Sequence, residues 1–468
     1  MKLLLIDPLG NALDLAMRAQ NDGHKVKHFI RQTPKTEWIG RGLVDVVADF
    51  KPWLRWADLV FNSDCTKYLR DLDNARREGI AVCGASENTA QWELDRTVGM
   101  QVLRRHGIDI LPSVEFTNYD KAIAHVKSHD KRFVSKPSGI VEDKSLSYVA
   151  KSPADLVYML ERWKKLGKQQ QFILQDYVEG TEFAVGGWFG PGGWNAGWCE
   201  NFEFKKLMNG DLGVATGEQG TVLRYVKSSK LARKVLLPLT DTLARENYVG
   251  YIDVNCIVED NGNVWPLEFT MRPGWPTMNI QLALQDGDSA QWLLDLAEGV
   301  DARRFILNVT AVGVVMSVPD YPYSHLTRKE VIGIPIYGPT PALWKHIHPC
   351  EMMMKEAPDE EFVHRPMACT AGDYILVMTA TGETVRETAD TVYRRLKRLV
   401  VPNSPQYRTD IGERLAKQLP KLQANGYAVE WHYSMASRPS KPSPASASRS
   451  NSSSPANLGT SSPTISSV

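Results

Sequence analysis

The N-terminal part of this chain, up to about residue 105, alternates short apolar runs with segments of helical pattern, and this alternation limits the folds open to it. The apolar runs read KLLLID, KVKHFI, ADLVFN and IAVCG, and the helical patterns between them cover residues 11–20 and 66–78. Strands that alternate with helices are typical of a parallel sheet, because parallel strands need long crossover connections. The sequence therefore predicts an N-terminal parallel α/β domain.

A proline marks the end of this first domain. One longer helix is predicted over 87–106, and Ile108-Asp109-Ile110-Leu111-Pro112 follows it. Proline lacks a backbone N–H and restricts the residue before it, so it favours a boundary between elements. We therefore assign residues 1–107 to the N-terminal domain.

The pattern changes after this boundary. Residues 113–180 read strand, helix, strand, strand, helix, strand, and 185–226 are rich in glycine and tryptophan, as antiparallel strands can be. A hairpin is predicted over 251–269, since its Asn261-Gly262 is a favoured two-residue turn. Residues 305–432 return to a β-rich pattern with one clear helix over 384–399. The expected fold class combines α/β and α+β regions.

The last part of the chain differs in composition from the rest. Residues 433–468 are rich in serine and proline and nearly lack large apolar side chains. Such a segment cannot bury enough surface to offset the entropy of ordering it, so we predict a disordered tail.

Composition narrows the class of protein. The chain of 468 residues has a net charge of +1, and its six cysteines show no CxxC pairs. A near-neutral charge gives no strong signal for nucleic acid, and no apolar run approaches the ~20 residues that a membrane span needs. The N-terminus reads as a first strand rather than a signal peptide. We expect a soluble, cytoplasmic protein with small-molecule substrates, as a monomer or homodimer.

The segment NVWPLEFTMRPGWP, residues 263–276, suggests chemistry. Side chains alternate along a strand, so Glu268, Thr270 and Arg272 are expected on one face and Phe269 and Met271 on the other. A carboxylate can hold Mg²⁺ against a phosphate, and an arginine can bind the phosphate through two hydrogen bonds. A solvated Glu/Arg pair on an edge strand would give the same pattern.

The order of several motifs is similar to that of one family, phosphoribosylamine–glycine ligase (glycinamide ribonucleotide synthetase) of the ATP-grasp superfamily. GASENTAQWELDRT at 84–97 resembles the family's GPTKxAAQLEGSK, and SKPSGIVEDKS at 135–145 resembles VKADGLAAGKG. LQDYVEGTEF at 174–183 resembles IEEFLDGEEA, and FKKLMNGDLGVATGEQG at 204–220 resembles HKRVGDGDxGPNTGGMG. LEFTMRPGWP at 267–276 resembles LEFNxRFGDP, and YRTDIGERL at 407–415 resembles FRKDIGWRA.

The resemblance implies an architecture and a reaction. It implies an ATP-grasp region over 108–304 with a mobile lid at about 113–182, and a small β-rich C-terminal domain over 305–432. The implied reaction uses ATP and Mg²⁺ (or Mn²⁺) to convert a carboxylate into an acyl phosphate, which an amine attacks to form an amide. A glycine-like carboxylate and an amine are the implied substrates.

The resemblance also implies roles for individual residues. Arg272 and Lys205 would be catalytic, and Glu268, Thr270 and Asn255 would hold the metal. The nucleotide would be bound by Lys136, Lys144, Gln175, Asp176, Val178, Glu182 and Arg96. Surface lysines, a strand that ends in a turn and an exposed hairpin are the structural alternatives for these positions.

Several positions depart from the family pattern. Met100 replaces a phosphate-contacting lysine, for which Arg96 could substitute one helical turn away, and Trp275 replaces an aspartate. Asp143 and Ser145 replace lid glycines, and the N-terminal phosphate loop GxGGREH is replaced by residues 7–13, DPLGNAL. A non-catalytic nucleotide-binding relative, or a ligase for a nucleotide or modified-base amine, therefore remain alternatives.

Overall fold

The computed structural model describes residues 1–137, 147–168, 171–301, 306–323, 329–359, 361–402 and 404–435. Contacts divide the chain into a unit of Met1–Ser434 and a unit of Met435–Val468. Apart from Met435, the second unit lies outside the described residues, and so does the predicted disorder of the tail. The helices and strands of the described residues all belong to the first unit.

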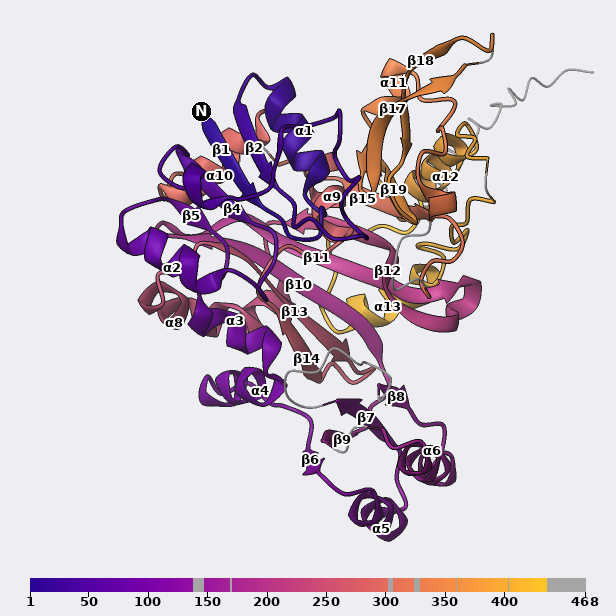
Figure 1. Ribbon diagram of the computed structural model, residues 1–468. Helices are drawn as coiled ribbons and strands as arrows, with labels where there is room; N and C mark the ends of the chain where they lie inside the picture. The colour runs from indigo at the N-terminus through magenta and orange to yellow at the C-terminus, as the bar shows by residue number, and fades with distance from the viewer. Residues whose placement is uncertain are drawn as a thin grey trace, which may run out of the picture. The chain divides into compact units, whose positions relative to one another are not determined.

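The N-terminal sheet is parallel throughout, with strand order β3-β2-β1-β4-β5 (Figure 1). Leu3 and Leu5 of β1 pack under α1 and α10, whereas Leu4 and Ile6 pack on the other face with α2. Both faces are covered, which explains the continuous apolar run KLLLI. The elements are β1 Lys2–Ile6, α1 Leu13–Asn21, β2 Lys25–Phe29, β3 Val46–Val47, η1 Lys51–Trp53, β4 Leu59–Asn62, α2 Leu69–Arg77, β5 Val82–Cys83 and α10 Ser289–Ala297.

The predicted single helix over 87–106 is wrong, because the structure has α3 Glu87–Leu94 and α4 Arg96–Arg105. Asp95 between them has an extended backbone, and its side chain accepts hydrogen bonds from the N–H groups of Thr97 and Val98 in the first turn of α4. This is an N-cap, which the apolar spacing alone does not reveal. Gly99 fits this corner because a Cβ there would lie 2.4 Å from the Trp92 carbonyl oxygen.

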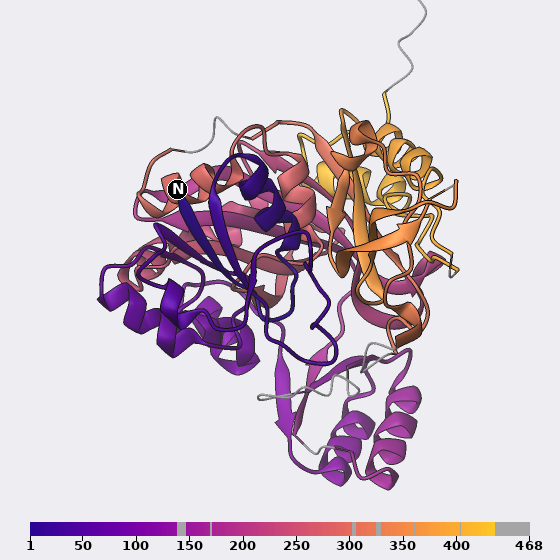
Figure 2. The ribbon, with the colours of Figure 1, turned by 45° about the horizontal axis from the view of Figure 1, so that its top comes forward.

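A second, four-stranded sheet has the order β6-β9-β7-β8, and α5 and α6 share its apolar core (Figures 1 and 2). Its strands pair antiparallel, and β9 lies between β6 and β7. We call this part the small lobe. Its elements match the predicted order and are β6 Ser113–Phe116, α5 Tyr119–His129, β7 Phe133–Pro137, β8 Tyr148–Val149, α6 Pro153–Lys165 and β9 Phe172–Asp176.

The largest sheet has eight antiparallel strands in the order β14-β13-β10-β11-β12-β15-β19-β16. It takes strands from both sides of residue 304, where we predicted a domain boundary. Its strands are β10 Thr181–Gly190, β11 Gly193–Met208, β12 Leu212–Val226, β13 Gly250–Val258, β14 Val264–Thr270, β15 Thr310–Ser317, β16 Ile347–Pro349 and β19 Tyr374–Gly382. The connections include η3 Asn209–Asp211, α7 Lys230–Val235, η4 Leu237–Leu239, α8 Thr240–Arg245 and α9 Thr277–Ala283.

The C-terminal part adds a two-stranded sheet and further helices to this scaffold. These elements are η6 Lys329–Val331, α11 Pro341–Trp344, β17 Met352–Pro358, β18 His364–Thr370, α12 Val385–Leu396 and α13 Leu415–Ala424. The expectation of one clear helix in this part is wrong. Helix α13 was not predicted from the sequence, although Leu415, Leu419 and Leu422 are buried at helical spacing, because Pro420 lies inside the helix.

The predicted combination of a parallel α/β region and antiparallel sheets is confirmed for the described residues. None of the helices in the described part of the chain has the length and apolar character that crossing a membrane requires.

Candidate functional site

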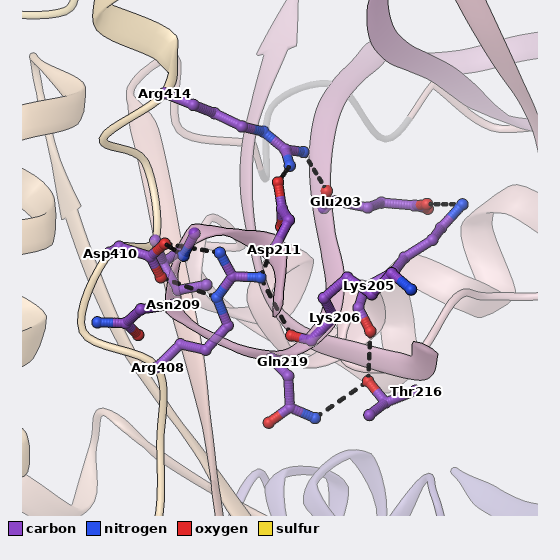
Figure 3. Close-up of polar contacts among 12 residues, drawn as sticks. Glu203, Lys205, Lys206, Asn209, Asp211, Thr216, Gln219, Arg408, Asp410 and Arg414 are labelled. Atoms are coloured by element: carbon purple, nitrogen blue, oxygen red, sulfur yellow. Dashed lines mark hydrogen bonds and ion pairs between the residues drawn. The ribbon is translucent and has the colours of Figure 1, made fainter. Parts of the chain in front are cut away.

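A cluster of opposite charges surrounds the ammonium group of Lys205. Its Nζ lies 2.8 Å from Glu182 Oε1, 2.9 Å from Glu203 Oε2 and 3.8 Å from Glu268 Oε1. Figure 3 shows the Glu203 and Lys205 side chains meeting beside the β11–β12 hairpin. Together with Arg96 and Lys136, these side chains form what we call the charged cluster.

Neighbouring strands of the large sheet bring the carboxylates together. Glu182 lies on β10, Glu203 and Lys205 share one face of β11, and Glu268 lies on β14. Asn255 on β13 pairs with Glu268 in register, and its Nδ2 donates to Glu182 Oε1 at 2.7 Å. The sheet therefore aligns groups that lie more than 80 residues apart in the sequence, between 182 and 268.

Arg96 connects the start of α4 to the end of the β13–β14 hairpin. Its Nη2 donates to Glu268 Oε2 at 2.9 Å, and its Nη1 donates to the carbonyl oxygen of Leu267 at 2.7 Å. The guanidinium thus binds both the side chain and the backbone of the same strand. Met100, one turn along α4, is buried, so it contributes to packing and not to the charged cluster.

The small lobe contributes Lys136. Its Nζ donates to Gln175 Oε1 at 2.8 Å, across the β7–β9 pair. Burial, then repulsion from Arg96 and Lys205, lower the pKa of Lys136 to about 7, although Glu268 and Glu182 act in the opposite direction. Lys136 therefore lies in the electrostatic field of the other residues of the cluster, where the small lobe meets the largest sheet.

Ion pairing decides the charge state of the three central groups. Although the Glu268 side chain stays partly exposed, desolvation by the protein around it acts to raise its pKa; Lys205, Arg96 and Lys136 outweigh this effect and hold that pKa well below its usual range. Burial likewise opposes ionisation of Glu182, and Lys205 and Asn255 lower its pKa. Despite burial, Glu182, Glu203 and Glu268 raise the pKa of Lys205 well above its ordinary value. All three are charged at neutral pH.

Two carboxyl groups beside the cluster have raised pKa values, in contrast to Glu182 and Glu268. Burial and the nearby Glu203 carboxylate raise the pKa of Glu218 well above normal. The same two causes raise the pKa of Asp253 to about 7. The negative charge of the site is therefore concentrated on the residues that contact Lys205.

The donor set suits a hard cation such as Mg²⁺. Glu268 keeps 45% of its side chain exposed, and the buried Asn255 has an Oδ1 atom without a hydrogen-bond partner among the described residues. Thr270 lies on the same strand face as Glu268 and pairs with Asp253. Mg²⁺ usually takes one or two carboxylates and completes its shell with water and phosphate oxygens. Within the described residues, no three His, Cys, Asp or Glu side chains form a ready metal cluster.

Arg272 lies elsewhere. Phe269 and Met271 are buried as the alternation predicts, but β14 ends at Thr270. The Nη2 atom of Arg272 donates to Glu93 Oε1 at 3.1 Å, so this guanidinium pairs with α3 and not with the charged cluster.

The remaining predicted nucleotide residues divide into three cases. Asp176 donates its backbone N–H to Pro112, and its carboxylate pairs with Lys131 at 2.8 Å, so neither group is directed to a ligand. Val178 follows β9 in the stretch that leads to β10 and is half-buried. Lys144 lies outside the described residues.

One partner of the cluster, Glu203, was not predicted from the sequence. Glu203 precedes Lys205 by two residues on a predicted strand, so alternation could have placed both on one face. Gln175 was predicted as a nucleotide-binding residue, and in the structure its side chain binds Lys136, a contact that only the β7–β9 register reveals.

The first turn of the N-terminal sheet is arranged differently. The buried Asp7 carboxylate accepts hydrogen bonds from the backbone N–H groups of Asn11 and Ala12 at 3.0 and 2.7 Å. Ser63 Oγ and His28 Nε2 contact the same carboxylate at 2.6 and 2.8 Å. The position beside the start of α1, where a parallel sheet can bind an anion, is filled by the chain itself.

Residues 95–278 match the family described as phosphoribosylglycinamide synthetase, ATP-grasp (A) domain. Phosphoribosylamine–glycine ligase from Ralstonia nicotianae is 22% identical over 371 residues, which cover 74% of this chain and 82% of the relative. This segment is similar to the ATP-grasp domain of phosphoribosylamine–glycine ligases. The resemblance seen in the sequence motifs is thereby confirmed, and the whole charged cluster lies within the matched ATP-grasp segment.

Solved structures show that the likeness of fold extends beyond the matched segment. The phosphoribosylamine–glycine ligase of Thermotoga maritima has a TM-score of 0.67 at 17% identity, covering 88% of this chain and 100% of that one. N5-carboxyaminoimidazole ribonucleotide synthetase from the same organism gives a TM-score of 0.54 at 14% identity, with 86% and 99% covered.

This chain spans less than half the length of one curated relative that it matches. Bifunctional purine biosynthetic protein PUR2,5 from Pichia angusta is 24% identical over 374 residues, which are 74% of this chain but 44% of that protein.

Proposed function

We propose that this protein is an ATP-dependent carboxylate–amine ligase that forms an amide through an acyl phosphate. The observation that carries the proposal is the charged cluster, in which Lys136 of the small lobe lies in the field of Glu268 and Lys205 of the large sheet. The cluster lies inside the segment that matches the ATP-grasp domain. A site where two lobes direct cations and a metal-binding carboxylate at one point suits phosphoryl transfer.

Different residues of the cluster would contact different parts of the reactants. Lys136 would bind the phosphates of ATP, and Glu182 would accept a hydrogen bond from the ribose. Glu268 and Asn255 Oδ1 would hold Mg²⁺, which would neutralise charge on the phosphate oxygens. Lys205 would orient the substrate carboxylate, which attacks the γ-phosphorus while ADP leaves.

The second half of the reaction needs an amine. Its nitrogen attacks the acyl carbon, phosphate leaves, and the nitrogen loses a proton. Water would hydrolyse the acyl phosphate, so the two lobes must close around it. Lys205 and Glu268 are partly exposed, so substrates can reach them before the lobes close.

One observation favours an amine other than phosphoribosylamine. Asp7 occupies the anion position beside α1 and takes two of the N–H groups that would otherwise be available to a phosphate. A phosphate there would meet a buried carboxylate with four hydrogen-bonding partners already in place. We therefore favour an amine without a phosphate at this turn, with glycine or a similar small amino acid as the carboxylate.

The test is acyl-phosphate trapping. Protein, MgATP and a panel of amino acids are incubated with hydroxylamine, which converts an acyl phosphate into a stable hydroxamate. We expect hydroxamate and ADP in equal amounts with glycine or another small amino acid. Absence of product with every carboxylate, together with absence of MgATP binding by calorimetry, would identify a non-catalytic relative and refute the proposal.

A second panel tests the amine. With the best carboxylate, phosphorylated and phosphate-free amines are compared by release of inorganic phosphate. We expect turnover with phosphate-free amines, and faster turnover with phosphoribosylamine would reject the argument from Asp7 while leaving the ligase chemistry intact.

A further inference from the structure

The β11–β12 ladder is irregular beside Lys205. Phe204 pairs with Gly220 and Lys206 pairs with Ala215, so the register shifts within this short stretch. On the other side of β11, the register with β10 ends at Asn201. Regular ladder hydrogen bonds therefore do not by themselves fix the backbone that carries Lys205.

Side chains bind the carbonyl groups of this stretch instead (Figure 3). Three of the four carbonyl oxygens from residue 203 to residue 206 accept a side-chain hydrogen bond. The donors are Arg414 Nη2 to Glu203 O, Thr216 Oγ1 to Lys205 O at 2.8 Å, and Arg408 Nη1 to Lys206 O at 3.1 Å. The two arginines come from the segment YRTDIGERL, about 200 residues further along the chain.

Both guanidinium groups are themselves fixed. Arg408 is 1% exposed and forms two parallel hydrogen bonds with Asp410, at 2.8 and 2.7 Å. Asp211 accepts from Arg408 at 2.8 Å and from Arg414 at 3.0 Å, so it joins the two arginines. The Arg414 guanidinium also lies 4.0 Å from the ring centroid of Phe204.

The same segment holds the turn of the hairpin. Gly210 donates its N–H to Asp410 Oδ2 at 2.8 Å, and Thr409 donates its N–H to Asn209 Oδ1 at 3.0 Å. Ile411 donates its N–H to the Tyr393 hydroxyl at 2.9 Å, which ties the segment to α12. The hairpin is therefore anchored to the C-terminal part at its turn and beside Lys205.

We propose that Arg408 and Arg414 are positioning residues for Lys205. They hold the β11 backbone on both sides of this lysine, so that its ammonium group stays between Glu182, Glu203 and Glu268. The inference rests on the proposed function, in which Lys205 orients the reacting carboxylate. Both arginines would act through the carbonyl groups of β11 that they bind.

Arg414→Lys in the full chain is the best probe, because Arg414 is 25% exposed and tolerates change better than the buried Arg408. Lysine keeps the charge but cannot span two acceptors with a planar fork. The matched control is Arg394→Lys, since Arg394 is exposed on α12 and bonds to Thr391 of the same helix.

Two measurements distinguish the variants. Hydrogen–deuterium exchange should become faster at 203–208 and stay unchanged at 181–190 in Arg414→Lys. The kcat of hydroxamate formation should fall about tenfold, because small displacements of a reacting group cost rate, while KM for MgATP stays within about twofold. The control should change neither. Arg408→Lys should shift both quantities in the same direction, with a lower melting temperature.

Unchanged exchange at 203–208 in Arg414→Lys would overturn the inference, as would an unchanged kcat. Faster exchange throughout the unit would indicate a general structural role and would also overturn it. If the unaltered protein forms no hydroxamate, the proposed function fails, and the exchange measurement still decides whether the arginines hold β11.

Discussion

The charged cluster and the first turn of the N-terminal sheet both contain carboxylates beside basic side chains, but they differ in solvent exposure and in hydrogen bonding. Around Lys205, the carboxylate of Glu268 stays 45% exposed although three cations hold it ionised. At the first turn, Asp7 and His28 are both fully buried, and the Asp7 carboxylate has four hydrogen-bonding partners. Charge alone therefore does not identify a ligand site; exposure and unused hydrogen-bonding capacity do.

This difference in exposure also predicts that the charged cluster matters for activity and the first turn for the free energy of unfolding. A half-exposed ion pair contributes little to folding, because water solvates its charges almost as well as the partner does. A buried carboxylate that satisfies four partners is costly to remove, because each partner loses its hydrogen bond away from water. Substitutions in the two regions should therefore affect different measurements.

The largest effect is expected for Glu268→Ala. Loss of the metal ligand should reduce hydroxamate formation about 100-fold or more, as removal of one stabilising group in a transition state does. The melting temperature should hardly change, because Glu268 is half-exposed. Asp260→Ala is the control, since Asp260 lies at the turn of the same hairpin in an exposed pair with Lys421. Turnover that persists in Glu268→Ala would show that this carboxylate does not hold a metal.

Asp7→Ala should show the reverse pattern. Two N–H groups just before α1, Ser63 and His28 would lose their acceptor, so the free energy of unfolding should fall by about 2–4 kcal/mol. Denaturant titration measures this loss, and hydroxamate formation per folded molecule should stay the same. The exposed Asp58, which accepts from the Lys2 N–H, gives the control Asp58→Ala, with an expected loss below about 1 kcal/mol. An equal loss in both variants would remove the contrast between the regions.

Lys136 should give a pH-dependent effect. With a pKa of about 7 it is mostly neutral at pH 8, and the phosphates of ATP would favour its charged form. Binding of MgATP at pH 8 should therefore take up a proton, which calorimetry in buffers of different ionisation enthalpy detects. Lys136→Met should abolish most of this uptake.

The same lowered pKa affects folding. The unfolded lysine, with a pKa of about 10.4, binds more protons than the folded one between pH 7 and that value. In this window the free energy of unfolding of the unaltered protein should rise with pH relative to Lys136→Met. The opposite slope would show that Lys136 is not held in its low-pKa environment.

The smallest effect is expected for Thr270→Asn. An amide oxygen is a better ligand for Mg²⁺ than a hydroxyl at the same place on β14. The Mg²⁺ concentration at half-maximal ATP binding should fall a few-fold, with little change in melting temperature. A rise would place the metal away from Thr270.

The sequence predicted much of the fold because local patterns carry it. The apolar runs gave the parallel strands, and Asn261-Gly262 marked the hairpin between β13 and β14. The two helical errors have local causes that periodicity does not show. Asp95 caps a new helix inside a continuous apolar pattern, and Pro420 inside α13 argues against a helix there on sequence grounds.

The site was predicted in part. The motifs pointed to Lys136, Glu182, Lys205 and Glu268. The structure places Lys205 within 4 Å of Glu182 and Glu268, and the charges of these residues act on the pKa of Lys136. Strand alternation also suggested that Arg272 would join Glu268, but the strand ends before it, and Glu93 of α3 binds it instead. Which partner a side chain meets depends on the register between strands and on helices from elsewhere in the chain.

By itself, the sequence determined most of the order of strands and helices, the similarity to ATP-grasp ligases and the residue types at the centre of the site. It could do so because hydrophobic periodicity and motif order are local properties. The tertiary structure alone decided that Asp7 closes the first turn and that Arg408 and Arg414 hold the backbone of Lys205. Those contacts join segments 56 and about 200 residues apart, and only packing brings such segments within hydrogen-bonding distance.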